Sequence, residues 1–333
     1  MARVAVILMN LGGPYSPEAV GPFLYNLFAD PAIIGLPGIF RLPLARWIAH
    51  SRAPTARDIY ARLGGASPLL ANTKVQAAAL EGALGPGYRC FVAMRYWRPL
   101  SDAAAGEVRQ WAADEIVCLP LYPQFSRTTT ASSLHAWRLA AAHRGLDLPT
   151  SVVGSYPAAP GFIAALAGLI RPELEAVAGG KRPRLLLTAH GLPKKLVQAG
   201  EPYPAQVEET AAAIVAALAS PGLDWRLCYQ SRVGPLAWIG PATDAEIRRA
   251  GADKVPLVVA PIAFVSEHSE TLVELDLDYR RVAEASGVPS YRRVPTVGTA
   301  PAFIAALAAL VERARANGSV GMPAGYPGGP ASR

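Results

Sequence analysis

The sequence predicts an α/β protein of two similar domains, each with a parallel β-sheet flanked by helices, that face each other across a cleft. Short runs rich in β-branched residues alternate with longer Ala-rich, helix-like segments, which is typical of parallel sheets with crossover helices. The two halves also resemble each other weakly, Val6–Pro14 with Leu185–Pro193 and Cys118–Thr130 with Val259–Thr271. Because ligands of such sheets bind outside the carboxyl ends of the strands, we expect these four motifs near the cleft.

The same alternation sets the expected elements in order. The expected strands are Val4–Asn10, Cys90–Tyr96, Glu115–Leu121, Ser151–Val153, Arg184–Thr188, Trp225–Tyr229, Lys254–Pro261 and Tyr291–Val294. The expected helices are Thr73–Leu84, Ala103–Ala112, Ser132–His143, Gly161–Val177, Tyr203–Leu218 and Ala302–Ala316. The run Pro256–Ala263 is almost continuously apolar, which fits a strand buried on both faces.

Length and loop composition predict the domain boundaries. A chain of 333 residues is long enough for two domains of about 150 residues each. We expect the first domain at residues 1–150 and the second at residues 151–316, whose last helix could pack back on the first domain. Residues 317–333 are rich in Gly and Pro and are expected to form a disordered tail.

An apolar segment in the first half, residues 32–48, stands apart from this alternation. It is broken by Pro37 and Pro43 and carries Arg41 and Arg46. One interpretation is a loop that packs on its own domain. The other is an exposed lip that touches a membrane or covers a flat apolar ligand, because Trp and Arg side chains suit an interface.

Composition narrows the functional classes. The net charge of +7 could favour anionic ligands or anionic membrane surfaces, whereas nucleic acid is not expected because the basic residues are scattered. The three cysteines are widely spaced, so neither a zinc site nor a disulfide framework is expected. No apolar run reaches the ~18 residues of a transmembrane helix. The first residues do not read as a secretory leader, so we expect a cytoplasmic protein.

The strongest local signal for chemistry is the acidic segment Ser266–Asp278, which follows a predicted buried strand. If it is a helix, Glu270, Glu274 and Asp278 lie on one face, with His268 at its head. A solvated acidic face is one interpretation. The other places these carboxylates at the mouth of the cleft, where they could attract a divalent cation or exchange protons.

Two further strand ends carry polar groups. His190 lies between a predicted strand and a Gly-x-Pro turn, where it could be structural or could accept protons or bind Fe²⁺. Tyr122, in Leu121–Ser126, could line a pocket for a flat ring, although the Ser and Thr residues that follow could equally be helix caps. Tyr229–Pro235, close to Trp238, is by itself only a polar strand-to-loop transition.

Together these segments resemble the ferrochelatase family, from about Val4 to Ala314. The runs that carry the resemblance, in the order and at about the spacing of the family, are NLGGP (Asn10–Pro14), YARLGGASPL (Tyr60–Leu69), LPLYPQFS (Leu119–Ser126), AHGLP (Ala189–Pro193), YQSRVGP (Tyr229–Pro235) and FVSEHSETLVELD (Phe264–Asp276). The resemblance implies a chelatase-like fold of two Rossmann-like domains with the porphyrin between them. It also implies a lyase of haem biosynthesis that inserts Fe²⁺ into protoporphyrin IX, giving protohaem and two protons.

The resemblance also implies roles for single residues. His190 matches the histidine that accepts pyrrole protons or meets the metal, and Glu270 matches the essential carboxylate, with Glu267 and His268 as its neighbours. Glu274 and Asp278 match an acidic path along a helix that is widened towards π geometry. The catalytic residues are therefore expected to be His190, Glu270 and His268. The metal is expected at His190, Glu270, Glu274 and Asp278. The residues expected to contact the porphyrin are Leu11, Arg52, Tyr60, Ser67, Arg95, Tyr122, Trp238 and Phe264.

One departure from the family concerns cofactors and assembly. Some relatives hold a [2Fe–2S] cluster with one cysteine just after the YPQ(F/Y)S motif and three near the C-terminus. Here Arg127 takes the first position and no cysteine follows Cys228. We therefore expect no permanently bound cofactor, with Fe²⁺ entering as a substrate. Because a Gly/Pro-rich tail replaces the extension that carries dimer contacts in those relatives, a monomer is expected.

Three rival functions stay open at this point. The enzyme could use coproporphyrin III, could insert another metal such as cobalt into another tetrapyrrole, or the chain could be a non-catalytic tetrapyrrole carrier. The NLGGP opening and the apolar lip at residues 32–48 favour protoporphyrin and peripheral contact with the inner face of the plasma membrane. The pairing of His190 with Glu270 disfavours a carrier, which needs no proton path.

Overall fold

The computed structural model describes residues 2–177, 182–232, 234 and 236–326 and divides the chain into two compact units. The first unit is Met1–Tyr156 together with Leu307–Arg333, and the second is Pro157–Ala306. The boundary expected at residue 150 falls inside a strand of the first sheet, Thr150–Val152. The predicted boundary is therefore wrong, because the chain leaves the first unit only after this strand has paired with its neighbour.

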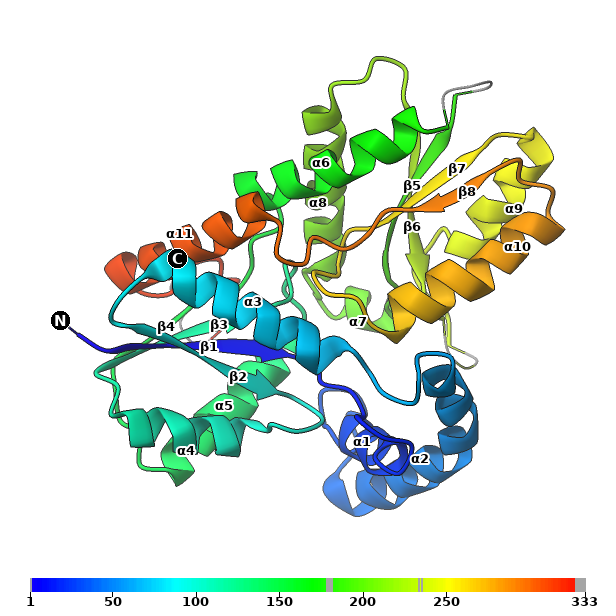
Figure 1. Ribbon diagram of the computed structural model, residues 1–333. Helices are drawn as coiled ribbons and strands as arrows, with labels where there is room; N and C mark the ends of the chain where they lie inside the picture. The colour runs from blue at the N-terminus through cyan, green and yellow to red at the C-terminus, as the bar shows by residue number, and fades with distance from the viewer. Residues whose placement is uncertain (1, 178–181, 233, 235, 327–333) are drawn as a thin grey trace. The chain divides into compact units, whose positions relative to one another are not determined.

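The first unit is built on a four-stranded parallel sheet in the order β2-β1-β3-β4. Its strands are β1 (Val4–Asn10), β2 (Tyr88–Met94), β3 (Glu115–Pro120) and β4 (Thr150–Val152). Its helices are α1 (Val20–Phe28), α2 (Gly38–Ala61), α3 (Leu69–Leu84), α4 (Ser101–Trp111), α5 (Ser132–His143) and the end of α11 (Pro301–Asn317). Figure 1 shows α4 and α5 on one side of the sheet and α3 on the other, which explains why every residue of β1 is buried.

The second unit repeats this plan in the order β6-β5-β7-β8, again with all strands parallel. Its strands are β5 (Arg184–His190), β6 (Asp224–Gln230), β7 (Leu257–Pro261) and β8 (Tyr291–Arg293). Its helices are α6 (Pro160–Glu175), α7 (Lys194–Gln198), α8 (Tyr203–Leu218), α9 (Thr243–Asp253) and α10 (Tyr279–Ala285), besides the beginning of α11. In Figure 1, α6 and α8 cover one face of this sheet and α9 and α10 cover the other.

The two sheets have the same strand order, which confirms the prediction of two similar α/β domains with parallel sheets. The likeness extends to a π-helix after the third strand of each unit, η1 (Arg127–Ala131) and η2 (Glu270–Asp278). These π-helices begin within or directly after the repeated motifs Cys118–Thr130 and Val259–Thr271. The weak internal sequence repeat therefore corresponds to a structural repeat, a strand followed by a π-helix, in the two units.

The segment 32–48 is not a loop, so that interpretation is wrong from Gly38 onwards. Helix α2 runs through Pro43 and Pro54 and packs on α1 through Ala45, Ala49 and Ala53. Each proline removes a backbone hydrogen bond from the helix, and the packing of α2 on α1 stabilises the helix beyond both of them. The other face is apolar and exposed at Leu36, Ile39, Phe40, Leu42 and Trp47. In the part of the chain that the structure describes, no helix is both long and apolar enough to cross a membrane.

The tail expected to be disordered is packed on the first unit as far as Tyr326, so that prediction is wrong for residues 318–326. Val320 pairs with Val153 beyond β4, and Met322 is buried in the core of the sheet. The Tyr326 ring lies against Phe125, with ring centroids 4.6 Å apart. A few apolar side chains among the glycines and prolines are enough to fix this segment. The remainder of the predicted tail, 327–333, lies outside the described residues.

Candidate active site

His190 and Glu270 form an ion pair at the carboxyl end of the second sheet. His190 is the last residue of β5 and Glu270 the first of η2, and His190 Nδ1 lies 2.9 Å from Glu270 Oε2. Burial alone would lower the pKa of His190, but the Glu270 carboxylate outweighs burial and raises it. Burial would likewise raise the pKa of Glu270, yet the charge and hydrogen bond of His190 lower it. Each group thus favours the charged form of the other, an imidazolium beside a carboxylate.

Glu274 lies behind this pair and is held by four hydrogen-bond donors. Its Oε1 accepts from the Ser231 backbone N–H at 2.8 Å and the Tyr279 hydroxyl at 2.9 Å. Its Oε2 accepts from the Ser231 hydroxyl at 2.5 Å and the Gln230 amide at 3.2 Å. Burial and the Glu270 carboxylate raise the pKa of Glu274, against the hydrogen bonds from Ser231 and Tyr279. The carboxylate has no unused lone-pair direction, which fixes its position.

Ser231 connects the two glutamates. Its hydroxyl lies 3.3 Å from Glu270 Oε2 as well as 2.5 Å from Glu274 Oε2. Its backbone is left-handed, with φ of 63°, a conformation that costs a residue with a Cβ about 1–2 kcal/mol. This turn at the end of β6 lets Ser231 present both its N–H and its hydroxyl to Glu274. Strain of this kind is found where the surroundings fix an unusual conformation, often at functional sites.

The other residues expected on this acidic segment play different parts. His268 is buried, shares a hydrogen bond of 3.0 Å with the Ser266 carbonyl and lies against Phe264, with ring centroids 4.5 Å apart. Its charge helps to lower the pKa of Glu270. Glu267 is turned towards Arg293, 2.9 Å away. Some side chains of the acidic segment thus hold the local structure in place, while others supply negative charge.

The expected set of four metal contacts is only partly assembled. His190, Glu270 and Glu274 lie in one network, but Asp278 is more exposed and its contact at 3.8 Å is with Arg281 on the same helical stretch. Within the described residues, no group of three or more His, Cys, Asp or Glu side chains is arranged to hold a metal ion. A π-helix was expected here from the resemblance, and η2 has that geometry over Glu270–Asp278.

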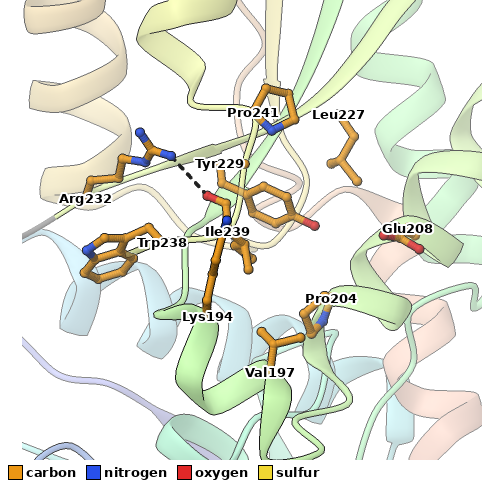
Figure 2. A pocket seen from close by; sticks show the side chains of 11 residues that line it. Lys194, Val197, Pro204, Glu208, Leu227, Tyr229, Arg232, Trp238, Ile239 and Pro241 are labelled. Carbon is orange, nitrogen blue, oxygen red and sulfur yellow. Dashed lines mark hydrogen bonds between the residues drawn. The ribbon is translucent and has the colours of Figure 1, made fainter. Parts of the chain in front are cut away.

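Trp238 forms one wall of the site. Its ring edge faces the His190 ring with centroids 6.5 Å apart, and its backbone pairs with Pro193 in an antiparallel bridge. Gly191 between them is needed because a Cβ there would meet the Gln230 carbonyl at 3.0 Å and the Trp238 ring at 3.3 Å. A cavity of about 660 Å³ is lined by Trp238 and by residues of α7, α8 and β6, as Figure 2 shows.

In the first unit, the residues expected to contact porphyrin form two groups. Leu11 and Tyr60 belong to one apolar cluster, and Ser67 is so close to Gly13 that a Cβ at Gly13 would meet its hydroxyl at 2.5 Å. The exposed Arg52 guanidinium lies over the Phe28 ring. These residues follow the end of β1 or lie on α2 and the turn that follows it.

The second group surrounds a buried carboxylate that the sequence did not reveal. Asp30 is 4% exposed and accepts hydrogen bonds from Arg95 at 2.7 Å, from the Tyr96 hydroxyl at 2.8 Å and from Ser132. Burial alone would raise the pKa of Asp30, but these donors lower it below its ordinary value. Arg95 also donates to Ser132 at 2.6 Å. Tyr122 is nearby, its hydroxyl 3.4 Å from that of Ser133.

Comparison with known proteins identifies the family. A family model described as Ferrochelatase matches residues 3–315. The chain belongs to the ferrochelatase family. It is 52% identical over 331 residues to a ferrochelatase of Caulobacter vibrioides, covering 97% of this chain and 94% of that one. It is 56% identical over 311 residues to a ferrochelatase of Phenylobacterium zucineum, covering 92% and 90%. As a member of this family, the chain acts in haem synthesis by inserting a metal into a porphyrin.

Solved structures support the fold. The model is similar to SirB from Bacillus subtilis with Fe³⁺, with a TM-score of 0.54 and 12% sequence identity, covering 95% of this chain and 97% of that one. It is also similar to a Deinococcus radiodurans protein described as having structural similarity to chelatases, with a TM-score of 0.50 and 14% identity, covering 93% of this chain and 55% of that one. The expected chelatase-like fold is therefore confirmed.

Proposed function

We propose that this ferrochelatase inserts Fe²⁺ into protoporphyrin IX, giving protohaem and releasing two protons. The observation that supports this most is the His190–Glu270 ion pair at the end of β5. The pair combines a group that can exchange protons near neutral pH with a carboxylate that suits a divalent cation. We place the metal and proton steps at these two residues. His268 assists them by favouring the charged form of Glu270.

The charge state of the pair suggests the order of events. Fe²⁺ approaching Glu270 competes for its oxygens and repels the imidazolium, and both effects lower the pKa of His190. His190 then loses its proton to water and, as a neutral imidazole, can accept the two pyrrole protons one after the other, passing each to water. Insertion exchanges two N–H protons for one Fe²⁺. The pocket would hold the porphyrin in a bent shape that exposes the nitrogen lone pairs.

We propose that Glu274 acts as a fixed negative charge behind the pair, because its oxygens are already occupied by Ser231, Tyr279 and Gln230. A carboxylate held in this way can attract Fe²⁺ towards the site without leaving its donors. Asp278, on the outer part of η2, would extend that attraction towards solvent.

Within the first unit, the arginines and hydroxyls would hold the porphyrin propionates, and Leu11 would contact the rings. Arg52 is the better propionate partner, because it is exposed and forms no ion pair among the described residues. Arg95 already forms an ion pair with Asp30, so only its remaining N–H groups would be available to donate to a propionate. Bidentate pairing of guanidinium with carboxylate gives such contacts their geometry.

We propose that the exposed apolar face of α2, together with Leu36 just before the helix, touches the surface of a membrane, which suits the less polar protoporphyrin. Ile39, Phe40 and Trp47 are 78%, 65% and 68% exposed, more than a face in contact only with water would favour. Co-sedimentation with anionic lipid vesicles tests this idea. Trp47→Ser should weaken binding. Leu139→Ser is the control, because it removes an exposed leucine on α5, outside this face, and it should leave binding unchanged.

We also propose that the enzyme works as a monomer without a [2Fe–2S] cluster. Arg127, at the position that resembles the first cluster cysteine, donates to the Tyr326 hydroxyl at 2.6 Å. Cys90, Cys118 and Cys228 are free thiols whose pKa values burial raises, which disfavours the thiolate that iron needs. Iron and sulfide analysis of the purified protein, with its sedimentation coefficient, checks both statements.

One assay tests the function. Purified enzyme is incubated anaerobically with Fe²⁺ and either protoporphyrin IX or coproporphyrin III, and loss of the free-base spectrum is followed. Turnover of protoporphyrin, with His190→Ala and Glu270→Gln nearly inactive, is the expected result. Preference for coproporphyrin would overturn the substrate, and porphyrin binding without metallation would overturn the reaction.

A further inference from the structure

The cavity beside β6 is a separate place from the acidic network. It is bounded by β6, by α7 and the start of α8, and by the segment 238–241 (Figure 2). Tyr229 lines it, whereas the next residue of the strand, Gln230, reaches Glu274. Because neighbouring side chains of a strand point to opposite faces, the cavity and Glu274 lie on opposite faces of β6.

Two polar side chains of this cavity, Tyr229 and Lys194, have no hydrogen-bond or ion-pair partner among the described residues. Tyr229 is only 5% exposed. Within the described part of the chain, Arg232 donates to the Ile239 carbonyl alone, at 3.4 Å. By contrast, Arg184 in the same unit bonds two aspartates. The Tyr229 hydroxyl lines the cavity, so it is available to a ligand that enters there.

The cavity has two chemically different ends. Figure 2 shows Arg232 and Lys194 on the side of Trp238, and the Tyr229 hydroxyl pointing towards Glu208 on the other side. Burial and the Glu208 carboxylate raise the pKa of Tyr229 to about 12, so its hydroxyl stays protonated. One end therefore offers two cations, and the other offers a hydrogen-bond donor beside an acceptor. Apolar side chains, including Val197, Leu227 and Ile239, lie among them.

We propose that this cavity binds a small organic carboxylate that carries an ammonium or hydroxyl group at its other end. The carboxylate would pair with Lys194 and Arg232, because a guanidinium and an ammonium together can satisfy its four lone pairs. The second group would donate to Glu208 or accept from Tyr229. A volume of about 660 Å³ is within the usual range of small-molecule sites.

Three ligands with the same six-carbon chain test the proposal by ligand-observed NMR: hexanoate, 6-hydroxyhexanoate and 6-aminohexanoate. We expect saturable millimolar binding, tightest for 6-aminohexanoate. Lys194→Met should weaken the binding of all three at least tenfold. Lys195→Met is the matched control, because Lys195 is the next residue of α7, is exposed and does not line the cavity.

The other end is tested separately. Glu208→Gln should remove the preference for 6-aminohexanoate over hexanoate while leaving hexanoate binding within twofold, and Glu209→Gln should leave the preference intact. Tyr229→Phe should weaken 6-hydroxyhexanoate several-fold and hexanoate little. Absence of saturable binding by all three ligands would overturn the proposal. Equal effects of Lys194→Met and Lys195→Met, or an unchanged preference in Glu208→Gln, would also overturn it.

Discussion

Ser231 is the residue whose replacement tests the acidic network most directly. Ser231→Ala removes a hydroxyl that donates to Glu274 Oε2 at 2.5 Å and lies 3.3 Å from Glu270 Oε2. The Ser231 N–H bond to Glu274 Oε1, at 2.8 Å, does not depend on the side chain. The variant thus loses one contact that keeps two like-charged carboxylates at a fixed spacing. The backbone conformation at residue 231 is expected to be unchanged.

The size of the effect follows from the charge of the acceptor. A hydrogen bond to a charged group contributes about 1.5–3 kcal/mol. If the network is needed in full when the metal enters, that loss lowers kcat by about 10- to 150-fold. Without the hydroxyl, the repulsion between Glu270 and Glu274 is less well compensated, so the pKa of Glu274 rises further above its ordinary value.

Ser231→Gly separates catalysis from stability. Glycine also lacks the hydroxyl, but it adopts the left-handed conformation, with φ of 63° in the parent chain, without a Cβ penalty. We expect Ser231→Gly to be more stable than Ser231→Ala by about 1 kcal/mol in urea unfolding, and equally slow in metal insertion.

The assay is anaerobic Fe²⁺ insertion with kcat and KM measured for both substrates, beside the unfolding curves. Activity of Ser231→Ala within twofold of the parent enzyme would refute the reasoning. So would a rate that follows stability, with Ser231→Gly recovering the parent kcat. Either result would mean that the hydroxyl contributes only to folding.

Three other predictions rest on single contacts. Tyr279→Phe removes the hydroxyl bond to Glu274 at 2.9 Å and should lower kcat about 10-fold in the same assay, with a smaller change in the KM for porphyrin; an unchanged kcat would contradict it. Truncation after Asn317 removes the segment that packs on Phe125 and the first sheet, and urea unfolding should show a loss of at least about 2 kcal/mol, whereas an equal midpoint would show that the segment is dispensable. The pH dependence follows from the ion pair. In the folded state the pKa of His190 is raised above 6.5. The stabilisation of the folded state by His190 is therefore complete below pH 6.5 and is lost as the pH rises through the folded pKa. The pKa of Glu270 falls from 4.5 to about 2, so its contribution is complete above pH 4.5 and is lost as pH falls towards 2. The stability difference between the parent and Glu270→Gln should therefore be largest between pH 4.5 and 6.5, and a difference that grows above neutral pH would contradict the assignment.

The elements with strong local patterns could be predicted from the sequence. The expected bounds of β1, α5 and α8 are those of the structure. Their burial pattern and their periodicity agree, so local and tertiary preferences point to the same conformation. Helix α2 could not be predicted in this way, because Pro43 and Pro54 are signals for the end of a helix. Only the packing of its alanines on α1 reveals why it continues.

The charged residues of the candidate site could be predicted, but their partners could not. His190 and Glu270 each follow a predicted strand, whereas Ser231 and Asp30 act through residues far away in the sequence. Ser231 lies inside the run Tyr229–Pro235, but nothing in that run indicates its contact with Glu274, and no local pattern marks Asp30. Tyr279 is an intermediate case: it lies five residues after Glu274, and a π-helix, with its i→i+5 hydrogen bonds, brings residues at that spacing close together. A π-helix was expected there, so the pairing could have been found.

The repeated π-helices show how the two units use the same backbone irregularity for different side chains. Both η1 and η2 follow the third strand of a unit, but η1 contains three threonines and η2 contains the glutamates. In η1 the Ser126 hydroxyl accepts from the Thr128 N–H, and the charged Arg127 donates to the Tyr326 hydroxyl. In η2 Glu270 and Glu274 lie four residues apart, and the end of β6 supplies Gln230 and Ser231 to hold them. The helix after the third strand thus carries hydroxyl groups in one unit, whereas in the other it carries two carboxylates that depend on hydrogen-bond donors from the end of β6.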